Sequence, residues 1–519
     1  MVMEIDKYLF EYNLGNWVVS THDKLEELAS FYSEHYGVWS ENSPFNKGKK
    51  ISLSANKIKE WLNNDISELW TVRDNGELVG YAIALKGISG SNEKLIWVTQ
   101  FVIHTDYRNI GIGKRLLFSI WGFSSFFAWG LVTANPFAVR ALEKATRRRC
   151  EPIRIRKNSQ QLLNFGKNYV NYIDNDTDKC VTESTSKIDT NFFVDHSDLV
   201  NMLAKTTDEN KPWLLGSIEE GWEWFAFTFN DQLPIELSTS EIEIMLNASD
   251  SIAQEAYNRM LMGNATHRWT DFTSLEVDYV ISQCNLTSKD AILDVGCGMG
   301  RHTIELCKRG FNSTGIDYAH GLIESATSKA KDENVNARFV LGDLSSTTID
   351  IESTNYDCII CLYDVIGSYA DNFKNIQILK NLTKLLKTGG FAVISVMNLH
   401  LTESIAKHKF SLSKSSKELL ALAASDTMET TGNIFNPDYF LIDEDTKIIY
   451  RKEVFSCGNS FPKELIVRDR RYYMDEIVEM CTDAGLEVIA KRYVGAGWQN
   501  DYELNHNKAK EILLTCRKK

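Results

Sequence analysis

The sequence predicts a multidomain α/β protein, with a mixed α/β fold in its N-terminal part and a parallel sheet in its C-terminal part. The chain has 519 residues, which is more than one hydrophobic core accommodates. Helix-like and strand-like runs alternate up to about residue 160, and Asn75 and Gly76 between two apolar runs indicate a hairpin. From about residue 257 strands again alternate with helices, which is typical of a parallel sheet covered on both faces.

The composition is that of a globular protein, with 43% hydrophobic and 24% charged residues. The net charge of −13 argues against a general binder of nucleic acids or anionic membranes, although it leaves room for a local basic groove. The N-terminus is acidic where a signal peptide would be basic, and the most apolar stretch, residues 118–132, is too short to span a bilayer. We therefore expect a cytoplasmic protein with reduced cysteines, no membrane partner and no bound metal.

The C-terminal part carries a glycine loop at the end of a short apolar strand, residues 291–295. Asp294 lies near the end of this strand, and a helix follows from residue 301. Three glycines separate the strand from the helix: Gly296, Gly298 and Gly300. Glycines let the backbone turn tightly and come close to a ligand that a side chain would block. This loop is a candidate cofactor site.

Acidic residues follow the next two strands. Asp317 ends the second strand, where a carboxylate is placed to accept both ribose hydroxyls of a nucleotide. Gly342, Asp343 and Leu344 follow the third strand, where the acid is placed to take an adenine amino group. Residues 257–519 thereby resemble the class I S-adenosylmethionine-dependent methyltransferases. The resemblance implies a Rossmann-like seven-stranded fold, with the loop at the methionine part of S-adenosylmethionine, Asp317 at its ribose and Asp343 at its adenine.

The methyl acceptor follows less directly from the sequence. Residues 362–369 lack the Asn/Asp-Pro-Pro-Tyr/Phe motif and the Pro-Cys nucleophile of enzymes that modify bases, and look like those of small-molecule amine or hydroxyl methyltransferases. Asp364, Tyr363 and His267 are the acceptor-side candidates; the alternatives are a helix-start acid, a packed ring and a surface histidine. Residues 397–466 interrupt the alternation, which predicts a lid or a small subdomain on the substrate side.

The N-terminal part carries a second loop, which joins a strand at residues 95–104 to an amphipathic helix. Backbone amides at the start of such a helix suit a pyrophosphate. The spacing Arg-x-x-Gly-x-Gly resembles the GNAT acetyltransferase superfamily. The resemblance implies binding of acetyl-CoA or another acyl-CoA by this loop: Arg108, Ile110, Gly111, Ile112, Gly113 and Lys114. Asn135 fits the next motif of the family, but Leu142 stands where the family often has a tyrosine acid.

Several residues are candidates for the base in acyl transfer. In this family it is commonly a carboxylate or a held water near the strand before the loop, so Glu93, Gln100 and His104 are candidates. The basic run at residues 147–157 would suit a phosphate or an RNA backbone, but we favour a solvated strand edge.

We therefore expect three regions: a GNAT acyltransferase-like domain (1–160), an aromatic-rich bridging region of unknown role (161–245) and a class I methyltransferase domain (246–519). The predicted function is a bifunctional group transferase. It methylates an amine or hydroxyl of a small molecule or peptide and carries out acetyl-CoA-dependent N-acyl transfer. The alternatives are a nucleic-acid or ribosome-associated modification enzyme, and a methyltransferase whose GNAT domain senses acyl-CoA without turnover. Neither the acceptors nor the oligomeric state follow from the sequence.

Overall fold

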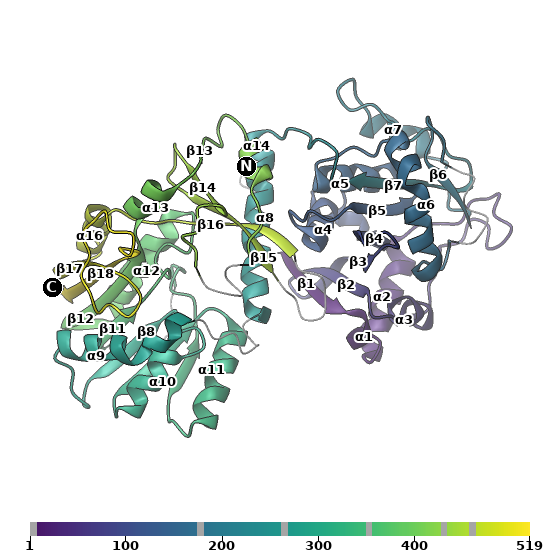
Figure 1. Cartoon of the computed structure of the whole chain (residues 1–519). Coiled ribbons are helices and arrows are strands. Elements are labelled where there is room, and N and C mark those ends of the chain that lie inside the picture. Colours follow the sequence, from purple (N-terminus) through teal and green to yellow (C-terminus); the bar gives the residue numbers. More distant parts are fainter. Residues whose placement is uncertain (1–7, 174–180, 261–267, 349–354, 427–432, 456–462) are drawn as a thin grey trace. The chain divides into compact units, whose positions relative to one another are not determined.

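A computed structural model describes residues 8–173, 181–260, 268–348, 355–426, 433–455 and 463–519 of the chain (Figure 1). The chain forms two units. Unit 1 comprises Met1–Ala248 and Asn459–Glu464, and unit 2 comprises Ser249–Gly458 and Leu465–Lys519. Within the residues described, no helix is long and apolar enough to cross a membrane.

Unit 1 is built on a seven-stranded mixed sheet with the order β1-β2-β3-β4-β5-β7-β6. Only β4 and β5 are parallel neighbours, and the other pairs are antiparallel. The strands are β1 (Tyr8–Leu14), β2 (Ser67–Asp74), β3 (Glu77–Ile88), β4 (Lys94–Ile103), β5 (Ala128–Thr133), β6 (Lys187–Phe192) and β7 (Gly221–Phe229).

Helices cover both faces of this sheet, because alternate residues of a strand point to opposite faces. On one face Tyr81, Ile83 and Val102 pack in a core with side chains of α2 and α3. On the other face Gly113 of α4 lies against Phe101. The helices are α1 (Gly15–Val18), α2 (His22–His35), α3 (Ala55–Leu62), α4 (Ile112–Trp121), α5 (Pro136–Thr146), α6 (Pro152–Tyr169), α7 (Leu199–Thr206) and α8 (Thr239–Met260), the last of which continues into unit 2.

Two local predictions for unit 1 have different outcomes. The hairpin is confirmed: β2 pairs with β3, and Asn75 and Gly76 have φ of 50° and 89°, as the tight turn requires. The solvated strand edge at residues 147–157 is wrong, because α6 begins at Pro152. Proline is favoured at the first helical position, where its missing N–H has no partner to lose.

The aromatic-rich region contributes to the same sheet. Its strand β7 pairs with β5 from Ala128 to Thr133, and β6 pairs with β7 at the edge. Phe225 and Phe227 of β7 pack against Trp97 of β4, with ring centroids 5.5 and 4.9 Å apart. The alternation of aromatic residues in β7 thus fills the core of unit 1.

Unit 2 is built on a seven-stranded sheet with the order β10-β9-β8-β11-β12-β18-β17. All neighbours are parallel except β18, which is antiparallel to both β12 and β17. The strands are β8 (Ala291–Val295), β9 (Asn312–Asp317), β10 (Arg338–Leu341), β11 (Tyr356–Cys361), β12 (Leu386–Met397), β17 (Leu486–Val494) and β18 (Glu511–Lys518).

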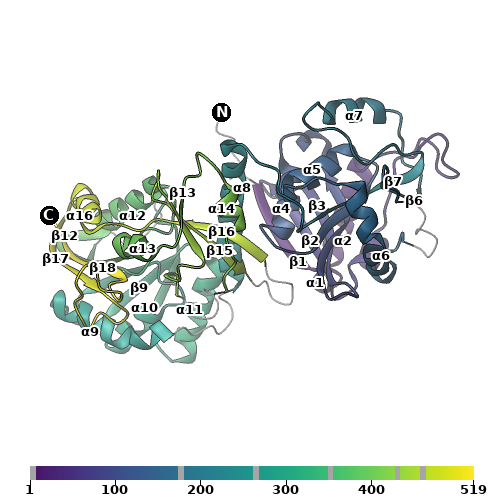
Figure 2. The same cartoon turned by 45° about the horizontal axis from the view of Figure 1, so that its top comes forward.

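The sheet of unit 2 lies between two helical layers (Figure 2). Side chains of α12 and α16 pack on one face, and those of α9 and α10 pack on the other. The helices are α9 (Thr273–Gln283), α10 (Arg301–Lys308), α11 (His320–Asp332), α12 (Asn372–Leu385) and α16 (Met474–Asp483). The predicted sheet with helices on both faces is confirmed.

The interruption expected at residues 397–466 contains a small sheet with the order β13-β14-β15-β16. Its elements are α13 (Leu399–Ile405), β13 (Lys409–Phe410), α14 (Lys417–Ala421), β14 (Phe440–Asp443), β15 (Ile449–Phe455) and β16 (Lys463–Asp469). Whether this segment acts as a lid stays a prediction.

Candidate functional sites

The glycine loop of unit 2 turns through three left-handed positions between β8 and α10. Gly296, Gly298 and Gly300 have φ of 69°, 54° and 76°. A Cβ atom at Gly300 would lie 2.5 Å from the Phe339 ring, whereas one at Gly298 would meet nothing within 4 Å. Gly300 is therefore needed for packing, and Gly298 leaves open space beside the loop, as a cofactor site requires.

Asp317 lies directly beside this open position. Its carboxylate accepts hydrogen bonds from the backbone N–H groups of Gly298 and Ala319, each 2.9 Å long. Burial raises the pKa of Asp317, and these two hydrogen bonds oppose the increase. The structure thus brings together two predicted cofactor residues that are 19 positions apart in the sequence.

The other predicted cofactor residues lie around the same edge of the sheet. Asp294 is buried and accepts a 2.8 Å hydrogen bond from Thr303 Oγ1, which ties β8 to α10. Asp343 follows β10 and accepts a hydrogen bond from the Ser345 N–H at 2.8 Å. Gly342 donates its N–H to the Asp317 carbonyl, and Leu344 is buried in the core. Since β8, β9 and β10 are parallel, their carboxyl ends present all these residues together.

A buried polar network lies next to the glycine loop, and the sequence did not reveal it. Glu276 of α9 is fully buried and accepts hydrogen bonds from Arg301 Nη1 at 2.7 Å, from His302 at 2.8 Å and from the Tyr363 hydroxyl. Burial favours a raised pKa, but the His302 hydrogen bond and the Arg301 charge outweigh it and lower the pKa of Glu276 to about 2. No local motif marks Glu276, because its partners are 25 to 87 positions away.

The predicted acceptor-side residues follow β11. Tyr363 has a φ of 65°, and its N–H donates to Ser395 Oγ at 2.5 Å. Its hydroxyl bonds to Glu276, and the Arg301 guanidinium lies 4.9 Å from its ring centroid, so the ring is held in place. Burial raises the pKa of Asp364, and the charge of Arg451 opposes it. His267 lies outside the described residues.

A second buried carboxylate, Glu511, lies near Tyr363. It is the first residue of β18 and pairs with Met397 at the carboxyl end of β12. Burial raises the pKa of Glu511 to about 7, while hydrogen bonds from Ser395 and Trp498 lower it. Ser395 therefore links Glu511 to Tyr363, and both lie at the edge that carries the glycine loop.

The loop of unit 1 follows the carboxyl end of β4. Gly111 has a φ of 94°, and a Cβ there would meet nothing within 4 Å, so the first turn of α4 presents its amides to open space. Ile112 is buried, whereas Ile110 has 42% of its surface exposed. Burial lowers the pKa of Lys114, and the charge of Lys144 adds to this.

Arg108 braces this loop. Its Nε donates to the Ile103 carbonyl at 3.1 Å, and its Nη2 donates to the His35 carbonyl. The ring centroids of His104 and His35 lie 3.9 Å apart. Nδ1 of His104 accepts the Asp106 N–H at 3.2 Å. Arg108 and His104 are thus part of the support of the loop, and a direct contact of Arg108 with a cofactor stays a prediction.

Asn135 and Glu93 lie at opposite ends of the parallel strand pair β4 and β5. Asn135 caps α5 by accepting the Phe137 N–H at 2.9 Å, and Leu142 is fully buried in α5. Glu93 is exposed and precedes β4, so the ten-residue strand, roughly 30 Å long, separates it from the loop. This position does not favour Glu93 as the base.

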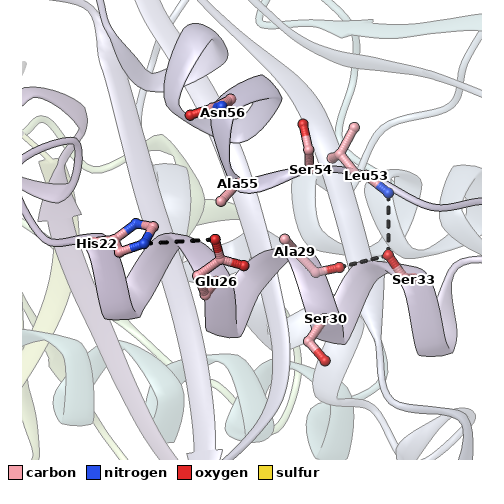
Figure 3. A pocket seen from close by; sticks show the side chains of 9 residues that line it. All are labelled: His22, Glu26, Ala29, Ser30, Ser33, Leu53, Ser54, Ala55 and Asn56. Carbon is pink, nitrogen blue, oxygen red and sulfur yellow. Dashed lines mark hydrogen bonds and ion pairs between the residues drawn. The ribbon is translucent and has the colours of Figure 1, made fainter.

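The surface also has a groove of ≈ 360 Å³ between α2 and the segment that leads into α3 (Figure 3). Its lining residues all belong to positions 22–56, so it lies at neither loop. Ser33 of this groove accepts the Leu53 N–H at 3.2 Å and donates to the Ala29 carbonyl at 2.8 Å, which fastens α2 to that segment. No group of three His, Cys, Asp or Glu side chains in the described ranges could hold a metal ion.

Known proteins match both halves of the chain. Residues 28–144 match the model of the acetyltransferase (GNAT) family, and residues 292–390 match that of a methyltransferase domain. The ubiquinone biosynthesis O-methyltransferase of Rickettsia conorii is 33% identical over 180 residues, which covers 32% of this chain and 59% of that protein. The protein of the same name from Rickettsia canadensis is 38% identical over 123 residues, covering 24% and 49%. The chain thus spans about half the length of these curated relatives.

The chain is also similar to solved structures of methyltransferases. A S-adenosylmethionine-dependent methyltransferase from Clostridium acetobutylicum is 17% identical, with a TM-score of 0.34, over 51% of this chain and 96% of that one. The CcbJ methyltransferase from Streptomyces caelestis is 15% identical, with a TM-score of 0.38, over 51% and 98%. Both family assignments made from the sequence are confirmed by the two family matches: the chain contains a GNAT-family acetyltransferase domain and a methyltransferase domain, each of an enzyme family that transfers groups.

Proposed function

We propose that the chain is a bifunctional group transferase. Unit 2 transfers the methyl group of S-adenosylmethionine to a hydroxyl or amine of a small molecule or peptide. Unit 1 transfers an acyl group from acetyl-CoA, or another acyl-CoA, to an amine. The observation that carries the first activity is the open position at Gly298, beside Asp317, at the carboxyl edge of a methyltransferase-family sheet.

The residues of unit 2 fit S-adenosylmethionine. The loop from Gly296 to Gly300 would hold the methionine part, the buried Asp317 carboxylate the ribose, and Asp343 with Leu344 the adenine. Asp294 would support the loop through its hydrogen bond with Thr303 of α10. When bound, this cofactor supplies an electrophilic methyl group. The curated relatives, which are named O-methyltransferases, favour a hydroxyl acceptor.

Glu511 is the best placed base for that acceptor. Its pKa of about 7 lets it accept a proton at neutral pH, whereas the strongly acidic Glu276 is a poor base. With the cofactor bound, the acceptor oxygen would give its proton to Glu511 as its bond to the methyl carbon forms and the methyl–sulfur bond breaks, and the sulfur would leave as a neutral thioether. Tyr363, which is fixed by Glu276 and by Ser395, positions the acceptor. Asp364 remains a second candidate on this side.

In unit 1 the amides at the start of α4 would hold the pyrophosphate of the acyl-CoA. The open position at Gly111 allows the close approach that this contact requires. Asn135, at the end of the neighbouring parallel strand β5, lies on the same edge of the sheet. We place the acyl group between the two strand ends.

The test is calorimetric binding of S-adenosylmethionine and of acetyl-CoA to the whole chain. Gly298→Ala places a methyl group in the open position, so S-adenosylmethionine affinity is expected to fall at least tenfold while acetyl-CoA binds normally. Gly310→Ala is the matched control, because its φ of 85° gives a similar backbone cost and its Cβ also meets nothing within 4 Å. Gly111→Ala is expected to weaken the binding of acetyl-CoA only.

The possible results separate the candidate functions. A wild-type chain that does not bind S-adenosylmethionine would overturn the proposal for unit 2. If acetyl-CoA binds but no free thiol is released with any amine, this would instead favour a unit 1 that senses acyl-CoA. Steeply salt-dependent RNA binding would favour the nucleic-acid alternative.

A further inference from the structure

Unit 1 contains a buried carboxylate for which the structure shows no cationic partner. Glu223 of β7 is only 7% exposed and accepts hydrogen bonds from Thr190 Oγ1, at 2.9 Å, and from the Ala134 backbone. Among the described side chains none forms an ion pair with it. Burial raises its pKa to about 7, and the two hydrogen bonds only partly oppose this. An ionised carboxylate in such a place is costly unless a cation joins it.

Glu223 lies where the parallel strands separate. The pairing of β4 with β5 covers only Leu95–Val98 and Ala128–Leu131, although β4 continues to Ile103 and β5 to Thr133. The hydrogen bond from Ala134 places the Glu223 carboxylate just beyond the end of β5. This is the edge of the sheet at which the loop from Arg108 to Lys114 follows β4.

Two other polar groups share its face of the sheet. Trp97 packs on Phe225, which is two residues after Glu223, so these side chains are on one face. Gln100 pairs with Ile83, and Tyr81 pairs with Val102, and both pairs face α2 rather than α4. The carboxylate, the amide and the phenol therefore lie on the face opposite to the helix that starts at the acyl-CoA loop.

Tyr81 and Gln100 each leave a buried atom without a partner. Within the described part of the chain, the Tyr81 hydroxyl and Gln100 Oε1 make no hydrogen bond, although Tyr81 is 0% and Gln100 9% exposed. Buried polar atoms in proteins are almost always hydrogen-bonded, and an orphan needs an explanation. A ligand with several N–H donors would satisfy the oxygens of all three residues.

Aromatic rings enclose this site. Tyr32 of α2 stacks on Tyr36, which follows α2, with centroids 4.3 Å apart, and the Tyr172 hydroxyl accepts the Trp97 Nε1–H at 3.1 Å. Burial, and then the charge of Glu223, raise the pKa of Tyr36, and both also raise the pKa of Tyr32 and of Tyr172. The titratable groups around Glu223 are thus neutral phenols. Tyr36, Tyr172 and Thr190 are partly exposed, whereas Glu223 and Tyr81 are buried.

We propose that Glu223, Tyr81 and Gln100 form the acyl-acceptor site of unit 1, that this site binds a primary ammonium group, and that Glu223 is the catalytic residue that takes its proton. The aromatic rings would add cation–π attraction. This inference rests on the proposed acyl transfer by unit 1.

The ammonium nitrogen gives one proton to the Glu223 carboxylate and becomes a free amine. The nitrogen then forms a bond to the thioester carbonyl carbon of the acyl-CoA, and the C–S bond breaks. The departing thiolate takes a second proton from the nitrogen through water. The products are the amide and the thiol, and Glu223 returns its proton to solvent.

The first test measures binding of n-butylammonium, tyramine and 1,5-diaminopentane to the whole chain by calorimetry. At least one is expected to bind to the wild type, and Glu223→Gln is expected to weaken it by roughly 30-fold or more. The matched control is Glu219→Gln, which changes an exposed carboxylate shortly before β7 and is expected to bind as the wild type does. If none of the three amines binds, or if Glu223→Gln binds as well as the wild type, the proposal is overturned.

The second test separates binding from folding and from acyl-CoA chemistry. Amine binding to the wild type is expected to weaken roughly 100-fold from pH 8 to pH 5, because only ionised Glu223 pairs with the cation, and Glu223→Gln should show no such slope. Tyr81→Phe removes an unpartnered hydroxyl, so its melting temperature should not fall while its amine affinity does. A wild-type amine affinity that does not change with pH, or an unchanged amine affinity in Tyr81→Phe, would contradict the proposed site. Acetyl-CoA binding is measured separately, so its loss with intact amine binding would count against the acyl-transfer function alone.

Discussion

At the scale of single residues, unit 2 holds two buried carboxylates with opposite properties. Glu276 is surrounded by donors from Arg301, His302 and Tyr363, which more than offset its desolvation. Glu511 is also buried, but its hydrogen bonds come from Ser395 and Trp498, which carry no charge. Burial acts on both in the same direction, so the neighbours decide which one ionises readily. Two carboxylates whose pKa values differ in this way suit two different roles, Glu276 as a positioning group and Glu511 as a base.

The first prediction concerns Glu276. Its folded-state pKa of about 2 lies below the unfolded value, so the ionised carboxylate stabilises the fold at neutral pH and loses this contribution as the pH falls toward 2. Glu276→Gln should therefore cost roughly 3 kcal/mol of unfolding free energy at pH 7. Denaturant unfolding at several pH values measures this, and the difference from the wild type should shrink below about pH 4.

The control for this experiment is Glu324→Gln, at an exposed position of α11. Its unfolding free energy should stay close to that of the wild type at every pH. An equal loss at pH 7 and at pH 3 in Glu276→Gln would show that the network stabilises the fold by packing and not through the ionised carboxylate.

The residues that the sequence identified are those that a local pattern carries. The glycine loop and Asp317 follow from strand ends and spacing, and the structure brings them into direct hydrogen-bond contact. Glu223, Glu276 and Glu511 lie in ordinary strands or helices, and their environments depend on contacts across the fold. The Tyr363–Glu276 bond, for example, joins positions 87 apart. A single sequence has no pattern that reports such contacts.

At the scale of elements, the small sheet of unit 2 is organised around a buried aspartate. Asp469 ends β16 and accepts Arg451 Nε, from the neighbouring β15, at 2.9 Å, and Arg471 Nε at 3.2 Å. Arg471 is itself fully buried and donates to Thr402 and to the Ile434 carbonyl. Burial favours a raised pKa of Asp469, but the charges of the two arginines lower it. This one carboxylate therefore connects β15, β16 and α13.

We expect Asp469→Asn to destabilise unit 2 by roughly 3 kcal/mol or more, because two buried guanidinium groups would lose their shared counter-charge. Denaturant unfolding with a probe of unit 2, and hydrogen exchange of β14 and β15, measure the change. Asp445→Asn, at an exposed position of the turn between β14 and β15, is the control and should have little effect. A loss confined to β14–β16, with the seven-stranded sheet unchanged, would show that the small sheet unfolds on its own.

The elements themselves were predictable to different degrees. Strands such as β8 and β9 were identified because apolar runs and glycines mark their limits. The strand edge expected at residues 147–157 is wrong because the overall charge carries no information on secondary structure, whereas Pro152 marks the start of α6. The sheet position of β7, next to β5, could not be derived either, since a strand pairing over about a hundred residues leaves no local signal.

At the scale of the whole molecule, each unit has a hydrophobic core of its own. One core lies between α2, α3 and the sheet of unit 1, and another lies between α12, α16 and the sheet of unit 2. The candidate cofactor loops are divided in the same way, with one loop in each unit. A cofactor bound at one loop is therefore expected to stabilise the unit that carries that loop.

We accordingly predict two thermal transitions, each raised by one cofactor. S-adenosylmethionine at 100 times its Kd adds about 2.7 kcal/mol to the unit that binds it, which corresponds to a shift of roughly 5 °C or more for domains of this size. Scanning calorimetry should show this shift in one transition only, with acetyl-CoA raising the other. Asp317→Ala should abolish the first shift and preserve the second. If each cofactor raised both transitions equally, the units would unfold as one body, and the separate cores would not be the units of stability.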